Sequence, residues 1–336
     1  MWEELTSWQN LYSAYRKACR HKKSKPETAR WMFDCERMLL ELQSELLEKR
    51  YKPRAYRYFM ITEPKERLIS VAVFRDRMVH HALVNVIEAH FEATFIKDSY
   101  ATRKQKGLHL AVQAAQNYAR SNPWFLKLDI RKYFASIDHA ILLGLIQRKI
   151  KDPHVISLCS IILANQNLSM GCSEGTGLPV GNLTSQFFAN IYLNQLDHFV
   201  KQQLKYTAYV RYMDDFILFA DDPQRLKDDL PIMREFLASS LRLELKDESA
   251  QLNRVSQGLP FLGYRVFPRL LRIRRENLKR CLRGISLQES AYAQGEIDSE
   301  TLYQSTRSRL GFIGFADSHR LQQNIWGKDQ QAVPTV

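Results

Sequence analysis

Apolar residues recur at helical spacing over the first fifty residues of the chain. Two apolar faces are present, one from Trp2 to Tyr15 and one from Trp31 to Leu46, with the basic break 20-RHKKSKP-26 between them. Similar patterns cover residues 76–90, 107–121, 138–165 (as two helices), 183–204 and about 223–240. All these stretches are predicted to be helices.

Other stretches carry the composition and turn residues of strands. Residues 55–74 predict a β-hairpin, with two β-prone arms around the turn 63-EPKE-66. A further short strand is expected at 259–268. A Gly-rich loop, 171-GCSEGTGLPVG-181, precedes the long helix that begins at 183. Helices and strands thus mix along the chain, which predicts the α+β class.

Two apolar segments contain carboxylates. The segment 124-WFLKLDI-130 predicts a buried strand that ends at Asp129. The segment 209-YVRYMDDFILFADD-222 predicts a hairpin whose arms are Tyr209–Tyr212 and Phe216–Ala220, with Asp214 and Asp215 in the turn between them. A plain Asp-Asp turn is the alternative explanation, because aspartate is a common turn residue.

The chain is strongly basic. Lysine and arginine number 49 against 36 acidic residues, which gives a net charge of +13 and favours a polyanionic partner such as nucleic acid. Between Arg265 and Arg283 eight basic residues are opposed only by Glu276. Leucine and isoleucine are interleaved with them, which predicts a helical lobe whose basic side lies on a phosphate backbone. The alternative is a solvated surface.

Several classes of protein are disfavoured. The chain has no N-terminal apolar region of a signal peptide and no apolar run approaching the ~18 residues of a membrane-spanning helix. Its five cysteines are scattered without a CxxC pair, which argues against a zinc site or a disulfide framework and favours reduced thiols in a cytoplasm. We therefore expect no membrane partner.

Three carboxylates at neighbouring strand ends would repel one another and raise their own pKa values unless cations bind there. Oxygen ligands of this kind hold hard divalent metals, and two such ions can assist an in-line displacement at phosphorus. A basic chain, two carboxylate-bearing strand ends and a Gly-rich loop together suggest nucleotidyl transfer.

An ordered set of motifs resembles the reverse transcriptase family, over about residues 50–270. The motifs are 64-PKERLI-69 with 76-DR-77, 99-SYATR-103, 126-LKLDIRKYFASI-137, 178-LPVGNLTSQFFANIYLNQLD-197, YMDD and 261-FLGY-264. The resemblance implies a right-hand polymerase fold. N-terminal helices and fingers are expected at 1–125, a palm at 126–265 with an interleaved fingers segment at about 140–190, and a helical basic thumb at 266–336.

The resemblance also implies roles for single residues. Asp129 and Asp214 match the ligands that bridge two Mg²⁺ ions, for which Mn²⁺ can substitute, with Asp215 beside them and the carbonyl of Ile130 as a further ligand. Phe134 matches the aromatic gate that excludes ribonucleotides, its alternative being a core phenylalanine. The implied dNTP-binding residues are Lys65, Arg67, Phe134, Val180 and Gly181, and the implied template- or primer-binding residues are Arg103, Lys104, Gln186, Arg272, Arg274, Arg275, Lys279 and Arg280.

Two departures from the common family pattern resemble one subfamily, the reverse transcriptases of diversity-generating retroelements. Val180 stands where most members have glutamine, and 185-SQ-186 replaces the later SP. This subfamily copies a template-repeat RNA into cDNA with misincorporation opposite adenines, and the cDNA diversifies a target gene. Valine cannot make the hydrogen bond that glutamine would make near the sugar of the dNTP, so we expect lower fidelity.

The subfamily implies a small basic helical accessory protein as a partner, besides template RNA, cDNA product and dNTPs. The N-terminal helices around Trp2 and Trp8 are the expected docking surface for this protein. The expected location is the bacterial cytoplasm, with the gene carried by the bacterium or by a phage. Many relatives have a lysine after YMDD as the general acid. Ser249 occupies that position here, and Lys246 lies three residues earlier.

Two other functions remain open. One is a faithful reverse transcriptase of the retron or group II intron type. The other is an RNA-binding protein that keeps the fold without chemistry, against which the intact Asp129, Asp214 and Asp215 argue.

Overall fold

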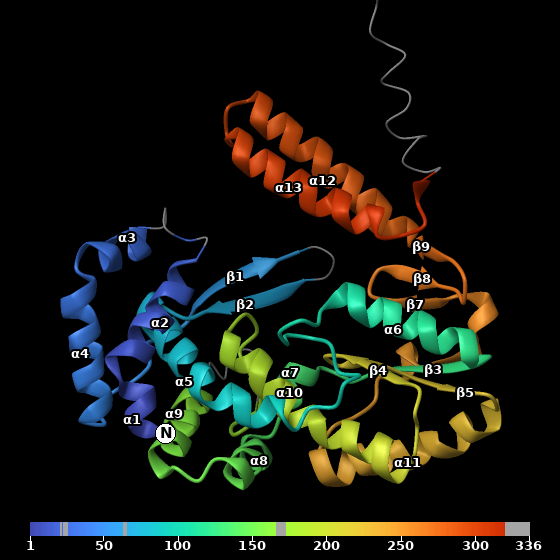
Figure 1. Cartoon of the computed structure of the whole chain (residues 1–336), viewed down its shortest axis with the longest axis horizontal. Helices are drawn as coiled ribbons and strands as arrows, with labels where there is room; N and C mark the ends of the chain where they lie inside the picture. Colours follow the sequence, from blue (N-terminus) through green and yellow to red (C-terminus); the bar gives the residue numbers. More distant parts are fainter. Residues whose placement is uncertain (21, 23–25, 63–65, 166–172, 320–336) are drawn as a thin grey trace, which may run out of the picture.

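The computed structural model describes residues 1–20, 22, 26–62, 66–165 and 173–319. Four helices begin the chain: α1 (Trp2–Thr6), α2 (Trp8–Cys19), α3 (Pro26–Phe33) and α4 (Cys35–Leu47). Helices α1 and α2 pack on the long helix α5 (Phe74–Glu92), and α4 packs on α1 and α2. Most of the predicted apolar residues are buried between these helices, whereas Tyr12 is exposed. This layer forms the left half of the molecule in Figure 1.

The docking surface expected around Trp2 and Trp8 stays a prediction, and the structure shows how these two side chains pack. Both are partly buried against the hydrophobic core; the Trp2 ring lies 5.7 Å from that of His154, and Trp8 stacks on Tyr12 at 6.4 Å. A large apolar ring at helical spacing is explained by core packing alone. Phe33 is instead the most exposed apolar side chain of this layer, at 95%.

The predicted hairpin at 55–74 is confirmed. Strands β1 (Arg57–Ile61) and β2 (Arg67–Val71) pair antiparallel, with Arg57 opposite Val71. Every residue of β1 is exposed, whereas Ser70 of β2 is buried. In Figure 1 this hairpin projects from the N-terminal helices toward the middle of the molecule.

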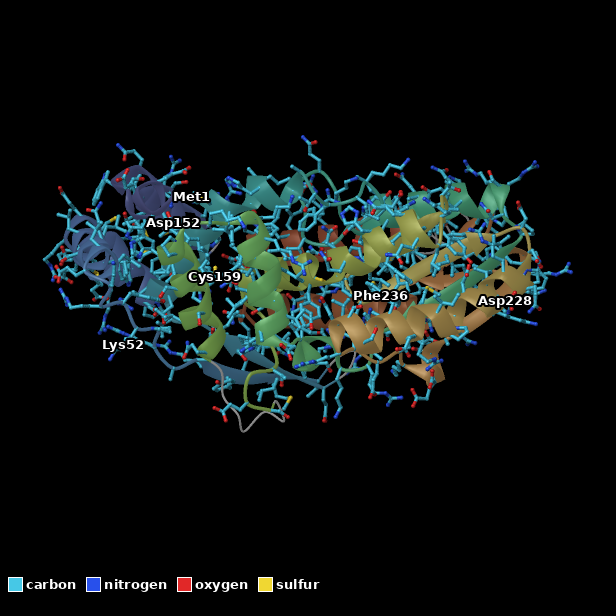
Figure 2. The ribbon with its side chains drawn as sticks, turned by 90° about the horizontal axis from the view of Figure 1, so that it is seen from below. Met1, Lys52, Asp152, Cys159, Asp228 and Phe236 are labelled. Carbon is cyan, nitrogen blue, oxygen red and sulfur yellow. The ribbon has the colours of Figure 1, made fainter. Side chains whose placement is uncertain are left out.

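A four-stranded antiparallel sheet lies at the centre, in the order β4-β5-β3-β6. Its strands are β3 (Trp124–Asp129), β4 (Tyr209–Tyr212), β5 (Asp215–Ala220) and β6 (Gln251–Arg254). Helices α10 (Leu183–His198) and α11 (Pro223–Leu241) cover one face, and α6 (Leu108–Ser121) covers the other, above the sheet in Figure 1. Seen from below, Figure 2 shows Phe236 of α11, whose ring stacks on Phe199 at 4.0 Å.

Alternation along β3 and β5 sorts their side chains between these two faces. Leu126 and Leu128 join the core beneath α10 and α11, while Phe125 joins the core beneath α6. Because successive side chains of a strand point to opposite faces, Lys127 and Asp129 lie on the α6 side with Phe125. The carboxylate at the end of β3 therefore lies on the α6 side of the sheet.

The central hairpin differs from the prediction by one residue. Tyr212 pairs with Asp215, so the two-residue turn is Met213–Asp214 and Asp215 is already the first residue of β5. Met213 has a φ of 56°, in the left-handed region. Turn propensity favoured the two aspartates, but pairing of the apolar arms sets the register and moves the turn onto methionine.

Between the strands, α7 (Tyr133–Ser136) is followed by α8 (His139–Lys149) and α9 (Pro153–Ala164), which confirms the two helices predicted for 138–165. The helix predicted for 183–204 consists of α10 and a π-helical turn, η2 (Phe199–Gln203). Asp152, labelled in Figure 2 beside Met1, caps α9 and accepts a hydrogen bond of 2.7 Å from the backbone nitrogen of Trp2.

A three-stranded sheet, β7 (Leu259–Phe261), β8 (Tyr264–Val266) and β9 (Leu271–Ile273), carries the helical pair α12 (Arg275–Ala293) and α13 (Ser299–Gly314). The single strand predicted for 259–268 is thus two strands of a hairpin. β9 lies inside the basic run, where Leu271 is buried and Arg272 exposed. In Figure 1 the helical pair stands above the β1–β2 hairpin. No helix among the described residues is long and apolar enough to cross a membrane.

Candidate active site

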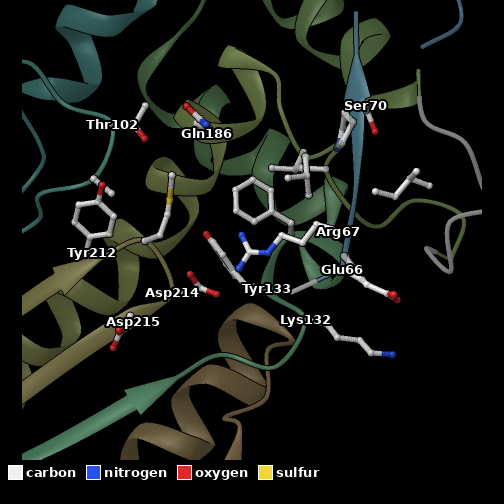
Figure 3. Close-up of a pocket in the computed structure, with 18 of the residues that line it drawn as sticks. Glu66, Arg67, Ser70, Thr102, Lys132, Tyr133, Gln186, Tyr212, Asp214 and Asp215 are labelled. Atoms are coloured by element: carbon white, nitrogen blue, oxygen red, sulfur yellow. The ribbon is translucent and has the colours of Figure 1, made fainter. Parts of the chain in front are cut away.

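A cavity of about 730 Å³ lies where the β1–β2 hairpin, the central sheet and the Gly-rich loop meet. Its walls come from β2, the loop before α7, the segment 178–180, the turn of the central hairpin and Leu262 beside β8. Figure 3 shows the labelled side chains around it. Segments far apart in the sequence therefore build one cleft, which contains most of the predicted catalytic and dNTP-binding positions.

Asp214 and Asp215 line this cavity, and Asp129 adjoins both. Asp129 ends β3 directly opposite Asp215 of β5, and the turn places Asp214 within hydrogen-bonding reach of Asp129. Burial, and next the charge of Asp129, raise the pKa of Asp214 to about 6, although the positive charge of Arg67 opposes the shift. Figure 3 shows the Asp214 carboxylate and the Arg67 guanidinium pointing toward one another.

Asp215 has a different environment. Its carboxylate forms an ion pair of 2.9 Å with Lys127, which lies on the same face of β3. Burial raises the pKa of Asp215 to about 7, and the charge of Lys127 opposes that rise. Asp215 is thus held by a cation of the protein itself, and it lines the cleft together with Asp214.

The donor set suits a hard cation. Among the described residues no three His, Cys, Asp or Glu side chains converge as a metal-binding group, and Asp129, Asp214 and Asp215 as metal ligands stay a prediction. Two adjacent carboxylates, one with a raised pKa, form a site that a divalent cation would relieve. Ile130, whose carbonyl is the further predicted ligand, is buried and pairs with Leu245 in an isolated bridge.

Three of the predicted dNTP-binding residues come from different elements and meet in the cavity. Arg67 of β2, Phe134 of α7 and Val180 of the Gly-rich loop all line the cavity. The backbone nitrogen of Leu178 donates to the carbonyl of Phe134 (2.7 Å), which joins this loop to α7. Lys65, the other predicted cation of the hairpin, lies outside the described residues.

Gly181 joins the Gly-rich loop to β2. The backbone nitrogen of Ser70 donates to the carbonyl of Val180 (2.8 Å), and Gly181 has a φ of 113°. A Cβ on Gly181 would lie 2.8 Å from Cγ2 of Ile69 and 3.1 Å from the carbonyl oxygen of Ser70. Only glycine allows both this backbone conformation and this close approach.

Gly181→Ala is expected to lower the free energy of unfolding by about 2–4 kcal/mol, from left-handed strain and a steric clash together. It should also raise the KM for dNTP, because the loop would separate from β2. Gly175→Ala is the matched control, since Gly175 has a φ of 74° and a Cβ added there would meet no heavy atom within 4 Å. Urea unfolding and dNTP titration measure both effects, and equal losses in the two variants would contradict the steric explanation.

The predicted template-binding residues differ in their exposure and in their partners. Gln186 lines the cavity. The Arg103 side chain is only 5% exposed; its guanidinium pairs with Glu92 at 2.6 Å and donates to the carbonyls of Ile96 and Ser99. The prediction that Arg103 lies along the template is therefore corrected to a structural role, because all its nitrogens are engaged within the protein.

Lys104 forms an ion pair with Glu88 and remains largely exposed. The basic residues near the C-terminal helices are also exposed, namely Arg272, Arg274, Arg275, Lys279 and Arg280. Arg274 forms an ion pair with Glu276 at 2.9 Å, and Arg280 donates to Asn277 at 3.1 Å. Exposed pairs of this kind are weak, so these cations stay available to a phosphate backbone.

Three charged residues near the site were not predicted from the sequence. Lys132 lines the cavity with a φ of 45°, and Figure 3 shows its side chain directed away from the aspartates. Lys127 could have been found from its position two residues before Asp129, on the same face of the strand. Arg211 is an arginine in an otherwise apolar strand, which is a sign of a buried polar partner.

Lys246 lies close to the carboxylates through its backbone. Its nitrogen donates to the carbonyl of Asp129 at 2.8 Å, and Ser249 donates back to the carbonyl of Lys246 from a short 3₁₀ turn. The side chain of Lys246 is half-buried, and the sequence assigns no residue as the general acid.

Comparisons with known proteins agree with this geometry. The family model described as reverse transcriptase (RNA-dependent DNA polymerase) matches residues 60–266. The group II intron-encoded protein LtrA of Lactococcus lactis subsp. cremoris is 27% identical over 330 aligned residues, which cover 77% of this chain and 54% of LtrA. Protein YkfC of Escherichia coli (strain K12) is 24% identical over 277 residues, covering 68% of this chain and 72% of YkfC. The chain thus spans about half the length of LtrA.

Solved structures support the fold. The apo telomerase of Candida tropicalis truncated from the C-terminal domain superposes with a TM-score of 0.51 at 12% identity, over 70% of this chain and 59% of the telomerase. The full apo telomerase gives a TM-score of 0.50, over 72% of this chain and 54% of that one. The expected α+β right-hand polymerase fold is confirmed.

Proposed function

Because the chain belongs to the reverse transcriptase (RNA-dependent DNA polymerase) family, we propose that it copies an RNA template into cDNA from dNTPs. The observation that carries this proposal is that Asp214 and Arg67 line one cleft, with Asp129 beside Asp214. A protein that only bound RNA would gain nothing from placing two carboxylates next to one another, because their mutual repulsion is costly.

Asp129 and Asp214 would hold the metal, with the backbone carbonyl of Ile130 as a further ligand. We propose two Mg²⁺ ions, for which Mn²⁺ can substitute; when bound they would favour ionisation of the primer 3′-hydroxyl and offset charge on the leaving pyrophosphate. Asp215 is proposed as a further ligand beside them, with its carboxylate paired to Lys127. Arg67 binds the triphosphate of the incoming dNTP, because its guanidinium offsets the negative charge and can donate to two phosphate oxygens at once.

The lobes follow from the same proposal. The β1–β2 hairpin with the N-terminal helices forms the fingers within 1–125, the central sheet forms the palm within 126–265, and α12–α13 form the thumb from 266. The exposed cations of the last lobe, from Arg272 to Arg280, are proposed to contact the phosphates of the template–primer duplex. Lys104 and Gln186 are proposed to contact the template from the opposite rim.

We further propose the low-fidelity subtype found in diversity-generating retroelements, which copies a template-repeat RNA for diversification of a target gene. Val180 supports it. The carbonyl of Val180 is fixed by Ser70, so its side chain enters the cavity from a rigid backbone and offers no hydrogen-bond donor to the sugar of the dNTP. A small basic helical accessory protein and a cytoplasmic location in a bacterial host belong to the same proposal.

Val180→Gln is expected to lower misincorporation opposite template adenine by roughly tenfold, because one oriented hydrogen bond contributes about 0.5–1.5 kcal/mol. The matched control is Val180→Met, which has a similar length and no amide. Sequencing of cDNA made by each variant measures the error at every template base. Equal error rates in the glutamine variant and the parent would refute this role of Val180.

The alternative is a faithful enzyme of the intron type, which the similarity to LtrA favours. Primer extension on an adenine-containing RNA, with dNTPs and Mg²⁺, separates the proposals. Errors confined to template adenines would support the mutagenic subtype, and accurate cDNA the intron type. Lack of product with the parent chain, even with its own RNA and accessory protein, would refute the polymerase and favour an RNA-binding protein.

A further inference from the structure

Arg211 of β4 is completely buried, with a relative exposure of 0%. Its Nε and Nη2 donate to the two carboxylate oxygens of Asp197 on α10, at 2.7 and 2.6 Å. Nη2 also donates to Oγ of Ser99 (2.9 Å), and Nη1 donates to Oδ1 of Asn190 (3.2 Å) and to the carbonyl of Met213 (3.1 Å). Five bonds thus match the five N–H donors of a guanidinium.

The bond to Met213 acts directly on the turn that carries Asp214. Met213 has a φ of 56°, a conformation that a methionine adopts only under constraint. A hydrogen bond to its carbonyl holds the peptide that links Met213 to Asp214. The direction of the Asp214 carboxylate toward Asp129 therefore depends on a group that lies entirely behind the turn.

The same arginine is also connected to the segment 99–101, which lies beside β4. Tyr100 donates its backbone nitrogen to the carbonyl of Arg211 (3.0 Å), and Asn190 donates its side-chain nitrogen to the carbonyl of Ala101 (2.8 Å). Ala101 lines the cavity, as does the neighbouring Thr102. One arginine therefore joins the catalytic turn, helix α10 and the segment 99–101.

We propose that Arg211, oriented by Asp197, is a positioning residue that sets the geometry of the catalytic turn for metal binding and nucleotidyl transfer. This inference rests on the proposed polymerase function. A buried ion pair is a poor source of stability compared with apolar residues of the same volume, so stability alone does not explain it. Lysine has three donors on a single nitrogen and cannot make the same five bonds.

Arg211→Lys tests the proposal because it keeps the positive charge and loses the planar guanidinium with its five N–H donors. We expect kcat at saturating dNTP to fall roughly 10- to 100-fold, the range known for small displacements of reacting groups, with little change in the KM for dNTP. The Mg²⁺ concentration for half-maximal rate should rise several-fold. Binding of Mn²⁺ without substrate, measured by calorimetry, should weaken by a similar factor, which provides a readout independent of turnover.

Tyr209→Phe is the matched control. The Tyr209 hydroxyl donates to Oδ1 of the same Asp197 carboxylate (2.8 Å) but does not bond to Arg211 or to the turn. Its removal should cost thermal stability while kcat and Mn²⁺ affinity stay within twofold of the parent. Asn190→Ala is the milder second variant, to be used if Arg211→Lys does not fold, and it should lower kcat several-fold.

The outcomes separate this inference from the proposed function. If the parent chain extends primers and a folded Arg211→Lys variant keeps its kcat and Mn²⁺ affinity, the positioning role is refuted and the polymerase stands. Equal losses of kcat in Tyr209→Phe and Arg211→Lys would also refute it, because they would follow stability alone. If the parent makes no product, the proposed function fails, whereas Mn²⁺ binding still tests the geometry.

Discussion

Replacement of Asp214 by asparagine is expected to abolish DNA synthesis and, at pH 8, to make the metal-free protein more resistant to heat than the parent chain. Synthesis should fall by at least about a thousandfold, the scale on which loss of a directly acting group is measured in other enzymes. The gain in stability follows because asparagine removes a buried charge beside Asp129. Few structural residues would combine these two effects.

The dependence of this gain on pH has a defined sign. Burial and Asp129 raise the pKa of Asp214 to about 6, so the native state binds this proton more tightly than the unfolded state does. The stabilising contribution of the protonated group is complete below the unfolded pKa, near 4, and is lost as the pH rises through about 6. The parent and the variant should therefore differ little at pH 4 and by about 1–3 kcal/mol at pH 8.

Thermal unfolding at pH 4, 6 and 8, with and without Mg²⁺, measures these effects. Mg²⁺ should raise the Tm of the parent at pH 8 more than that of Asp214→Asn, since the variant lacks one ligand. Asp221→Asn is the control, because Asp221 is exposed at the other end of β5. A variant that still extends primers, or that is less stable than the parent at pH 8, would contradict the assigned role of Asp214.

Local pattern predicted the parts of the site that lie on regular strands. The apolar run 124-WFLKLDI-130 became β3, and the apolar arms around YMDD became β4 and β5. Each of these segments has a side-chain period that fixes its face in the sheet, so the position of Asp129 followed from the sequence. The turn was misplaced by one residue because the propensity of aspartate for turns has less energetic weight than pairing along the arms.

Long-range ion pairs could not be predicted in the same way. Arg103 looked like a template cation, yet Glu92 of α5 and two backbone carbonyls hold it. The five donors of Arg211 are satisfied by residues as far away as Ser99, 112 positions along the chain. A buried arginine bonds to other groups of the protein, whereas an exposed one stays available to a ligand. Whether an arginine is buried depends on how helices and strands pack together, and the periodicity of the sequence does not predict that packing.

Replacement of Phe134 by valine is expected to allow incorporation of ribonucleotides. Phe134 lines the cavity, as do Val180 and Asp214. Its ring packs at 5.7 Å against Tyr133, and its carbonyl accepts a hydrogen bond from Leu178, which holds the backbone that carries the ring. Loss of this steric exclusion should raise rNTP use relative to dNTP roughly 10- to 200-fold.

Tyr133→Phe is the matched control for this effect. Tyr133 is buried beside Phe134, and its hydroxyl donates to the carbonyl of Ala189 on α10 at 2.5 Å. Loss of that bond should lower stability without altering the choice of sugar, because the hydroxyl is engaged with α10. Single-nucleotide incorporation with matched dNTP and rNTP gives kcat/KM for both sugars in each variant. An unchanged ratio in Phe134→Val would mean that Phe134 is a core residue and that another group reads the sugar. A raised ratio in Phe134→Val alone would make this ring the part of the cleft that selects DNA as the product.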